Sequence, residues 1–535
     1  MIFTRRQFNK RALQFVLGAS IPPTLLQACR AKTPPVIAPQ TNISNTVNGQ
    51  VNTMLAQMTV DTELLVPTFL GNDQRRFYGR GIPEGLNILD KFPLGTGRTR
   101  AGIWKTWSGA GWTGQPTLTK DRGKIYLIIG AYDHSLRKID IATNEQVWRY
   151  KFDDVIKGSS TIYLDPTADE DNQIVVLQGS RLGNKNSTST PKPIPSFRAL
   201  SFRTGEELWK LDIRKTNSYS RDNDSSAIDL GNGMLFNAGE NGIGYFLNSS
   251  TASARMKSGL KQPPILAEVK LYETSDISRQ GGNLVTESSP ARLGDKIFVA
   301  AGSGHIYGIS IESQTIVWDF FTGSDLDGSV VISKDDKLFC AIEKQYIPGK
   351  GGAIKLNPNR NPSDAVEWFL PTGNRKFSSW KGGIIGSVSL NDEYNPDGAF
   401  PALFATSAID GNLYVGSQHK TTGKTVKGPW RKQEYDTPLV LFQKNIGGSI
   451  STPIFTEGNK LIAAGYNGVY MFDLYFEPTS PDNPEAVENS QGDFLRVVVE
   501  ESGRFKPGIS FEATPVVWDG IVRICARDGW LYTLG

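Results

Sequence analysis

The sequence predicts an all-β fold made of small repeated sheets that close into a ring. A strand-like run, cut by a turn and then resumed, recurs eight times with a period of roughly 50 to 60 residues. In six copies the cut is a compact hairpin turn, at residues 133–137, 241–245, 304–308, 410–414, 467–471 and 528–532. Because each unit must bury its apolar side on the next, these repeats predict a β-propeller.

Each unit contains a recognisable series of strands. The Asp-Gly or Asn-Gly pairs tolerate positive φ and favour tight hairpins, so the runs on both sides of them are predicted strands. A further strand lies upstream, opened in several units by a proline such as Pro290, Pro453 or Pro515, which the first residue of a strand tolerates. The units begin near Gln115, Ser159, Asn223, Ser288, Ser329, Ser387, Ser451 and Thr514, which gives eight blades.

The unit ends in a turn and a tryptophan. Residues 199–209, Ala-Leu-Ser-Phe-Arg-Thr-Gly-Glu-Glu-Leu-Trp, are the fullest copy. Here the sequence resembles the PQQ-type (quinoprotein-type) β-propeller repeat over about residues 101–535. The resemblance implies four antiparallel strands per blade and tryptophans that dock one blade on the next. The tryptophans that we expect to have this structural role are Trp104, Trp148, Trp209, Trp318 and Trp368.

The last unit ends at Gly535, where every other unit still has its outer strand to come. Residues 102–107 precede the first unit and end in the expected tryptophan. We therefore predict that this N-terminal strand completes the last blade and closes the ring, which also removes exposed sheet edges.

The amino terminus is predicted to be an export signal. Residues 4–10, with Arg5 and Arg6, resemble a twin-arginine signal, and an interrupted apolar stretch leads to Ala28 and Cys29, which resemble a bacterial lipobox. The alternative is a plain export signal with an incidental cysteine. The predicted division is a signal peptide at 1–28, a disordered tether at 29–60, an extension packed on the propeller flank at 61–100, and the propeller at 101–535.

Charge and residue counts exclude several functions. The chain has 58 basic and 54 acidic residues, and four of the basic ones lie in the signal, so the mature part is close to neutral. This balance gives no electrostatic reason to expect nucleic acid. Three histidines are too few for a histidine-rich metal site. Cys340 and Cys525 lie in strand-like runs of different blades and are expected to be buried free thiols.

Unusual residues gather where each outer strand connects to the next inner strand, around the mouth of the central channel. The candidates are Arg221, Asp222, Arg279, Glu287, Asp327, Trp380, Lys381 and Glu512. Convergent charges with one aromatic plate would suit a small ligand or a quinone. The alternative is that these residues only pair with each other or with solvent.

The longest departures from the repeat fall between third and fourth strands, at residues 248–264, 357–365, 419–437 and 477–492. They are predicted to emerge on the face opposite the hairpin turns. Elaborated loops on a rigid scaffold commonly make binding surfaces, so this face is a candidate docking face.

Two functions remain open. The first is a non-enzymatic, lipid-anchored scaffold on the periplasmic side of a bacterial cell envelope, expected to be monomeric, that binds an envelope protein. This resembles the class of BamB-type lipoproteins. The second is an oxidoreductase that binds PQQ with calcium at the channel mouth. The chain has neither adjacent cysteines nor a Cys-x-x-Cys-His motif, both typical of such enzymes or their electron carriers. We therefore favour the scaffold, with no cofactor.

Overall fold

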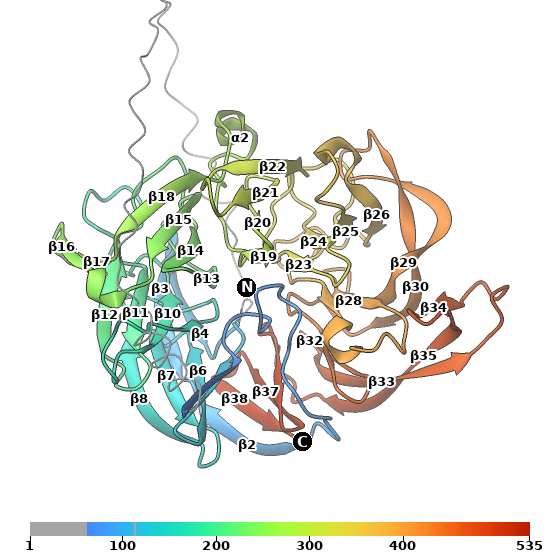
Figure 1. The fold of residues 1–535 in the computed structure, drawn as a ribbon, viewed down its shortest axis with the longest axis horizontal. Coiled ribbons are helices and arrows are strands. Elements are labelled where there is room, and N and C mark those ends of the chain that lie inside the picture. Colours follow the sequence, from blue (N-terminus) through green and yellow to red (C-terminus); the bar gives the residue numbers. More distant parts are fainter. Residues whose placement is uncertain (1–60, 112–113) are drawn as a thin grey trace, which may run out of the picture.

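The computed structural model describes residues 61–111 and 114–535, which form eight antiparallel sheets around a common axis (Figure 1). The prediction of an all-β, eight-bladed propeller with four-stranded blades is confirmed. Strands are given from the innermost to the outermost. Blade 1 contains β5 (Thr117–Asp121), β6 (Lys124–Gly130), β7 (Ser135–Asp140) and β8 (Glu145–Lys151), and blade 2 contains β9 (Thr161–Leu164), β10 (Ile174–Gly179), β11 (Phe197–Ser201) and β12 (Glu207–Leu211). Blade 3 contains β13 (Ile228–Gly231), β14 (Met234–Gly239), β15 (Ile243–Asn248) and β18 (Ile265–Lys270), and blade 4 contains β19 (Ala291–Leu293), β20 (Lys296–Ala300), β21 (His305–Ser310) and β22 (Ile316–Phe321).

The next four blades follow the same order. Blade 5 contains β23 (Val331–Ile332), β24 (Leu338–Ile342), β25 (Gly352–Leu356) and β26 (Val366–Pro371), and blade 6 contains β27 (Ser389–Leu390), β28 (Leu403–Ser407), β29 (Asn412–Lys427) and β30 (Glu434–Asn445). Blade 7 contains β31 (Ile454–Thr456), β32 (Lys460–Gly465), β33 (Gly468–Pro478) and β35 (Phe494–Phe505), with β34 (Val487–Glu488) on its edge. Blade 8 contains β36 (Val516–Trp518), β37 (Ile521–Cys525), β38 (Trp530–Leu534) and β2 (Ile88–Pro93).

The ring closes through a different strand from the one that we predicted. An N-terminal strand does complete the last blade, but it is β2, which pairs antiparallel with β38. Residues 102–107 instead fall in β4 (Ile103–Ser108), which pairs only with β3 (Thr96–Ala101). The reason is burial: Phe92 of β2 packs in the core between blades, whereas Trp104 is 49% exposed and docks no blade.

The other four tryptophans lie between blades. The indole Nε1 of Trp148 donates a hydrogen bond to the carbonyl of Phe202 in the next blade. Trp318 and Trp368 do the same toward Arg360 and Gln418. Trp209 is fully buried among side chains of blades 2 and 3.

A belt of hydrogen bonds joins the inner ends of the blades. Backbone amides at the start of one blade donate to a hydroxyl at the start of the next, as in Ser289 to Ser329 (2.8 Å) and Ser329 to Ser387 (2.9 Å). The other links are Gln115 to Ser159, Ser226 to Ser289, Ser387 to Thr452 and Thr452 to Thr514, with Ser226 Oγ bonded to the Ser159 carbonyl and Gln115 Nε2 to the Pro515 carbonyl. The belt therefore runs through all eight blades.

The first described residues lie inside the ring and not on its flank. Strand β1 (Thr62–Val66) adds to the inner edge of β5, and Figure 1 shows the chain continuing through the middle of the ring. Carbonyls of this segment accept hydrogen bonds from inner strands: Pro67 from Ile162, Asp73 from Arg292 and Tyr78 from Val517. Residues 62–81, which we call the central segment, therefore fill one end of the channel.

Smaller elements decorate the blades. These are β16 (Arg255–Lys257), β17 (Leu260–Gln262), the helix α2 (Thr274–Arg279) and the 3-10 turns η2 (Thr251–Ser253), η3 (Pro362–Asp364) and η4 (Asp392–Tyr394). The predicted insertions at 248–264, 357–365 and 477–492 do lie essentially between third and fourth strands, whereas most of 419–437 belongs to the long strands β29 and β30 themselves. Cys340 and Cys525 are buried free thiols, as expected, and burial raises the pKa of both.

Candidate functional site

The channel mouth, at the end opposite the central segment, is formed by two repeated positions of each blade. One is the residue two places before the belt residue, and the other directly precedes the hairpin turn between second and third strands. In the described chain the first position is occupied by Lys157, Asp224, Glu287, Asp327, Ile385, Ile450 and Glu512, and the second includes Tyr132, Glu240, Glu343, Ile409, Tyr466 and Arg527. The repeat thus brings side chains from distant parts of the sequence to one place.

Blades 2 to 4 contribute a buried carboxylate cluster. Ligand oxygens of Asp224, Glu240 and Glu287 all lie within 4.8 Å of one another. The ammonium of Lys157 forms ion pairs with Asp224 and, at 3.4 Å, with Glu240. Burial raises the pKa of both Asp224 and Glu240. Burial lowers the pKa of Lys157, but the neighbouring carboxylates outweigh it and the pKa is raised.

Asp222 lies beside this cluster. Its Oδ2 accepts a hydrogen bond from Nε of Arg181 at 2.8 Å, and its Oδ1 accepts one from the amide of Leu182 at 2.9 Å. Burial tends to raise the pKa of Asp222, but the charges of Arg181 and Lys157 outweigh it and the pKa is lowered. Asp222 is therefore a buried, ionised group.

Blades 4 and 5 contribute a second acidic group, formed by Asp325, Asp327 and Glu343, whose oxygens also lie within 4.8 Å of one another. Asp325 accepts hydrogen bonds from Nδ2 of Asn283 (2.6 Å) and Nε2 of Gln345 (2.9 Å). The Oδ1 of Asn283 is buried and has no hydrogen-bond partner within the described part of the chain. Three carboxylates and an amide oxygen are ligands that calcium prefers.

The other half of the mouth is different in character. Ile385, Ile409 and Ile450 form an apolar cluster against Phe377 and Trp380, whose rings stack at 6.4 Å. Next to it, Glu512 accepts hydrogen bonds from Tyr466 and Arg527, both at 2.6 Å. The mouth therefore combines an acidic half with an apolar half.

The structure separates the predicted site residues. Asp222, Glu287, Asp327 and Glu512 lie at the mouth, but in different clusters. Arg221 is turned away: its guanidinium donates to the carbonyls of Ile213, Thr190 and Lys192 and to Asp212. Arg279, on α2, pairs with Asp276 and lies over the ring of Phe321. Trp380 and the exposed Lys381 lie beside blade 5.

The sequence reasoning missed Lys157, Asp224, Arg181, Glu240, Asp325, Glu343 and Arg527. A signal was present for several of them. Glu240, Tyr466 and Arg527 each stand directly before an Asn-Gly or Asp-Gly pair, so the alignment of the hairpin turns alone would have placed them together.

The hairpin of β3 and β4 lies against the mouth. Trp107 packs on the Tyr132 ring at 5.2 Å, and the Thr99 hydroxyl accepts a hydrogen bond from Arg181. Its far end is exposed, with Ile103 62% and Trp104 49% accessible. This hairpin, which we expected to close the ring, therefore covers part of the mouth.

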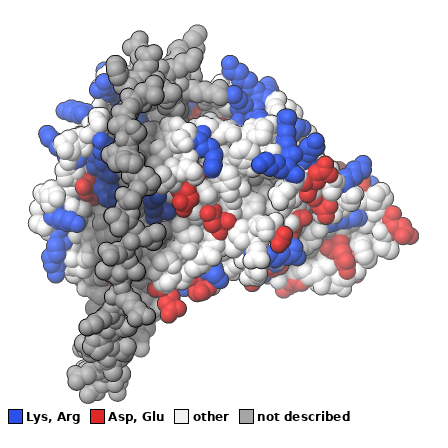
Figure 2. Space-filling model, turned by 90° about the horizontal axis from the view of Figure 1, so that it is seen from above, with Lys and Arg blue, Asp and Glu red and all other residues white. Residues whose placement is uncertain are grey.

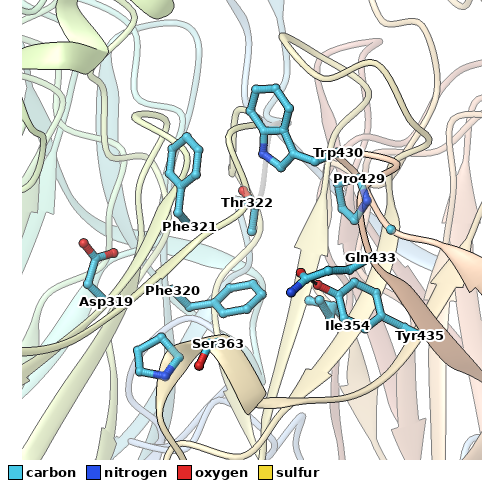
Figure 3. Close-up of a pocket in the computed structure, with 12 residues that line it drawn as sticks. Asp319, Phe320, Phe321, Thr322, Ile354, Ser363, Pro429, Trp430, Gln433 and Tyr435 are labelled. Atoms are coloured by element: carbon cyan, nitrogen blue, oxygen red, sulfur yellow. Dashed lines mark hydrogen bonds between the residues drawn. The ribbon is translucent and has the colours of Figure 1, made fainter.

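A cavity among the described residues lies away from the mouth (Figure 3). It has a volume of about 270 Å³ and lies between β22 of blade 4, η3 of blade 5 and the tip of the β29–β30 hairpin. Phe320 and Phe321 face Trp430 and Tyr435 across it. The rings of Phe321 and Trp430 stack at 6.0 Å, which joins the hairpin tip of blade 6 to blade 4.

One family model and several solved structures are similar to this chain. A family model described as "Outer membrane protein assembly factor BamB" matches residues 95–345. No curated protein matches the chain. Among solved structures, BamB from Moraxella catarrhalis is 12% identical, with a TM-score of 0.45, and 83% of this chain and 97% of that chain are covered.

Two solved enzymes are also similar. A europium-containing methanol dehydrogenase is 10% identical, with a TM-score of 0.49 and coverage of 86% of this chain and 89% of that one. Quinohemoprotein alcohol dehydrogenase from Comamonas testosteroni is 12% identical, with a TM-score of 0.47 and coverage of 91% of this chain and 84% of that one.

No helix in residues 61–111 or 114–535 has the length and apolar character needed to span a bilayer. The predictions for Arg5, Arg6 and Cys29 concern residues outside the described part of the chain. The repeat pattern, the eight four-stranded blades and the family model that matches residues 95–345 together support a β-propeller built from PQQ-like repeats.

Proposed function

We propose that the protein is a non-enzymatic lipoprotein of the bacterial cell envelope that binds another envelope protein through its propeller faces. The family model that matches residues 95–345 carries the name of an assembly factor, which supports a role in binding proteins. The twin-arginine-like residues Arg5 and Arg6 and the lipobox-like Cys29 support export and anchoring by lipid on the periplasmic side.

The observation that carries this proposal is the length of two hairpins. Strands β29, β30, β33 and β35 have 16, 12, 11 and 12 residues, whereas the third and fourth strands of the other blades have 5 to 7. Figure 1 shows these hairpins reaching beyond the ring. The tip of the β29–β30 hairpin packs on blade 4 through Trp430, but the extra length of β33 and β35 is not needed to fill a blade, so it is available to present a surface. Tyr475 of β33 is 48% exposed there.

Crosslinking in intact cells tests the scaffold. A photo-crosslinking amino acid at Tyr475 is expected to capture a defined envelope protein. The matched control is the same amino acid at Tyr219, a 37% exposed tyrosine on a mouth-side loop next to Gly282. A specific adduct from Tyr475 and none from Tyr219 supports docking through the long hairpins. Equal labelling at both positions, or no adduct from Tyr475, contradicts it.

The second candidate function is binding of PQQ with calcium at the channel mouth. The favouring observation is the group of Asp325, Asp327 and Glu343 with the buried Oδ1 of Asn283 nearby. The three carboxylates and the amide oxygen are the ligand types that calcium prefers, so these residues would hold the ion. The cluster of Asp224, Glu240 and Glu287 fits less well, because the Lys157 ammonium already supplies its positive charge. Bound PQQ would supply two-electron redox chemistry.

Addition of PQQ and calcium to purified protein separates the two candidates. If the protein is a scaffold, we expect neither a stoichiometric quinone absorption band nor dye-linked oxidation of alcohols or sugars. A stoichiometric band that is lost in Asp327→Asn, together with turnover, would replace the scaffold by the oxidoreductase.

A further inference from the structure

A second, smaller cavity lies between two lysines on blade 5. Its volume is about 70 Å³, and it is lined by Lys344, Gln345, Tyr346, Ile347, Ser379 and Lys381. Lys344, Gln345, Tyr346 and Ile347 follow β24, and Ser379 and Lys381 belong to the connection between blades 5 and 6. The cavity is thus formed by two loops that the propeller fold brings side by side.

Backbone contacts hold the two loops in register. The amide of Lys344 donates to the carbonyl of Gly382 at 3.0 Å, and Glu343 forms a β-bridge with Gly383. Phe377 and Trp380 exchange two hydrogen bonds of 3.0 Å and make a tight turn that contains Ser379. Lys344 and Lys381 are therefore fixed near each other by the main chain, and not only by flexible side chains.

Both loops adopt costly backbone conformations at the cavity. Tyr346 has φ of 61° and Ser378 has φ of 54°, in the left-handed region that most side chains avoid. Gly383 has φ of +82°, and a Cβ there would lie 2.5 Å from the Ile342 carbonyl oxygen. Left-handed non-glycine residues cluster at binding sites, where the fold holds them for a purpose other than stability.

The charges around the cavity are predominantly positive. The Lys344 ammonium donates to the carbonyls of Ile347 (2.9 Å) and Gly349, which leaves one N–H. Partial burial and then the charges of Arg431 and Lys381 lower the pKa of Lys344. The segments that meet here, 344–350, 373–383 and 428–433, contain seven lysines and arginines and no acidic residue, and Glu343, directly before the first of them, belongs to the acidic group of the mouth.

Acidic groups are present nearby, but they are directed elsewhere. Asp325 accepts hydrogen bonds from Gln345 and Asn283 in the acidic group of the mouth, and Asp410 accepts them from the Gly373 amide and the Tyr414 hydroxyl. On the face of the molecule that Figure 2 shows, basic side chains gather in the upper right, and acidic side chains lie below them among further basic ones.

We propose that the cavity between Lys344 and Lys381 binds a phosphate group, either as a free anion or as part of a lipid headgroup. Lys381, Ser379 and Lys344 line the cavity, and the Lys381 ammonium, the Ser379 hydroxyl and the remaining N–H of Lys344 are the donors available to such an anion. Hydrogen bonds from ammonium groups to phosphate oxygens are the strong, charge-assisted kind. A space of about 70 Å³ equals that of two to three waters at roughly 30 Å³ each, which suits a five-atom oxyanion.

Calorimetric titration of the full-length chain with inorganic phosphate, at constant ionic strength, tests this site. The expected result is saturable one-site binding with a dissociation constant on the order of 1 mM. Lys381→Ala should weaken it by roughly tenfold, because one charge-assisted contact is lost. Lys376→Ala is the matched control: it removes an exposed lysine of the same segment that does not line the cavity, and it should leave the affinity unchanged.

Vesicle flotation distinguishes the two sources of phosphate. Binding to phosphatidic acid vesicles but not to phosphatidylcholine vesicles, lost in Lys381→Ala and retained in Lys376→Ala, assigns the site to a lipid headgroup. Binding of inorganic phosphate without vesicle binding assigns it to a soluble phosphate. The proposal is overturned if phosphate gives no saturable binding up to 20 times the expected dissociation constant, or if Lys381→Ala and Lys376→Ala weaken binding equally.

Discussion

Arg75 has no exposed surface, yet its guanidinium joins three parts of the molecule. It donates to the carbonyls of Pro290 and Phe69 at 2.8 Å and to the Thr68 hydroxyl at 2.7 Å. Burial lowers its pKa to about 10, so it remains charged at neutral pH. Arg75→Met should reduce the free energy of unfolding by about 3 kcal/mol, because these buried carbonyls lose their donor.

Urea denaturation followed by tryptophan fluorescence measures this loss. Arg80→Met, at an exposed position of the same segment, is the control and should change stability by less than about 0.5 kcal/mol. Equal midpoints for the two variants would mean that the central segment does not stabilise the ring.

A carboxylate between blades 6 and 7 predicts a pH dependence. Glu501 of β35 pairs with Arg504 and, at 2.5 Å, with Lys444 of β30, and hydrogen bonds from these two groups lower its pKa to about 2. A lowered carboxyl pKa means that the stabilisation is present above the unfolded pKa, near 4.5, and is lost as the pH falls toward 2. After allowance for solvent screening, it amounts to about 1 kcal/mol.

Comparison of the wild type with Glu501→Gln by urea denaturation checks this window. The wild type should be more stable by about 1 kcal/mol at pH 6, and the difference should shrink between pH 4.5 and pH 3. A difference that is constant over this range would show that the carboxylate charge is not the cause.

Among the elements, the outer strand of blade 8 can be tested directly, because the structure assigns it to β2 and the sequence had predicted residues 102–107 of β4. Phe92 of β2 is 9% exposed in the core between blades, whereas Trp104 of β4 is 49% exposed. Phe92→Ala should therefore cost about 3 kcal/mol of unfolding free energy. Trp104→Ala, although it removes a larger side chain, should cost less than about 1 kcal/mol. Thermal or urea unfolding of both variants checks the order, and the reverse order would restore β4 as the closing strand.

The elements that the sequence predicted are those with a repeated local signal. The hairpin turns, the proline-opened inner strands and the turn before Trp209 are read from neighbouring residues, so the eight blades could be predicted. The β2 strand has no such signal, because its partner β38 lies more than 400 residues away in the sequence. Trp107, at the end of residues 102–107, matches the local pattern of the repeat. That match does not indicate that β4 pairs with β3 instead of with the last blade.

The same limit applies to the candidate site. Asp222, Glu287, Asp327 and Glu512 were found because they lie in the connections that recur before each blade. Two of the partners that give them their chemistry, Lys157 and Arg181, come from the neighbouring blade, whereas Arg527 lies in the same blade as Glu512. A side-chain pair between blades leaves no spacing rule in the sequence, so the prediction reached the positions but not the ion pairs.

In the molecule as a whole, three sets of contacts hold the ring of blades together. The belt of hydroxyls links neighbouring blades, the central segment bonds to inner strands around the axis, and β2 joins the two ends of the described chain in one sheet. Each of these contacts bridges residues distant in sequence, so none can form until much of the ring is assembled. We therefore expect unfolding to begin where the ring is closed without a covalent link, between β2 and β38.

A disulfide across this closure tests that expectation. Asp90 and Thr533 are register partners of β2 and β38, and replacement of both by Cys would enclose about 440 residues in one loop. Oxidation should raise the free energy of unfolding by about 2 to 4 kcal/mol and slow unfolding. Cys340 and Cys525 are buried, and burial raises their pKa, so they should not exchange with the new bridge. The experiment uses a Cys29→Ser background and compares oxidised with reduced protein. Identical urea midpoints and unfolding rates would show that the ring opens somewhere other than at the junction of its two ends.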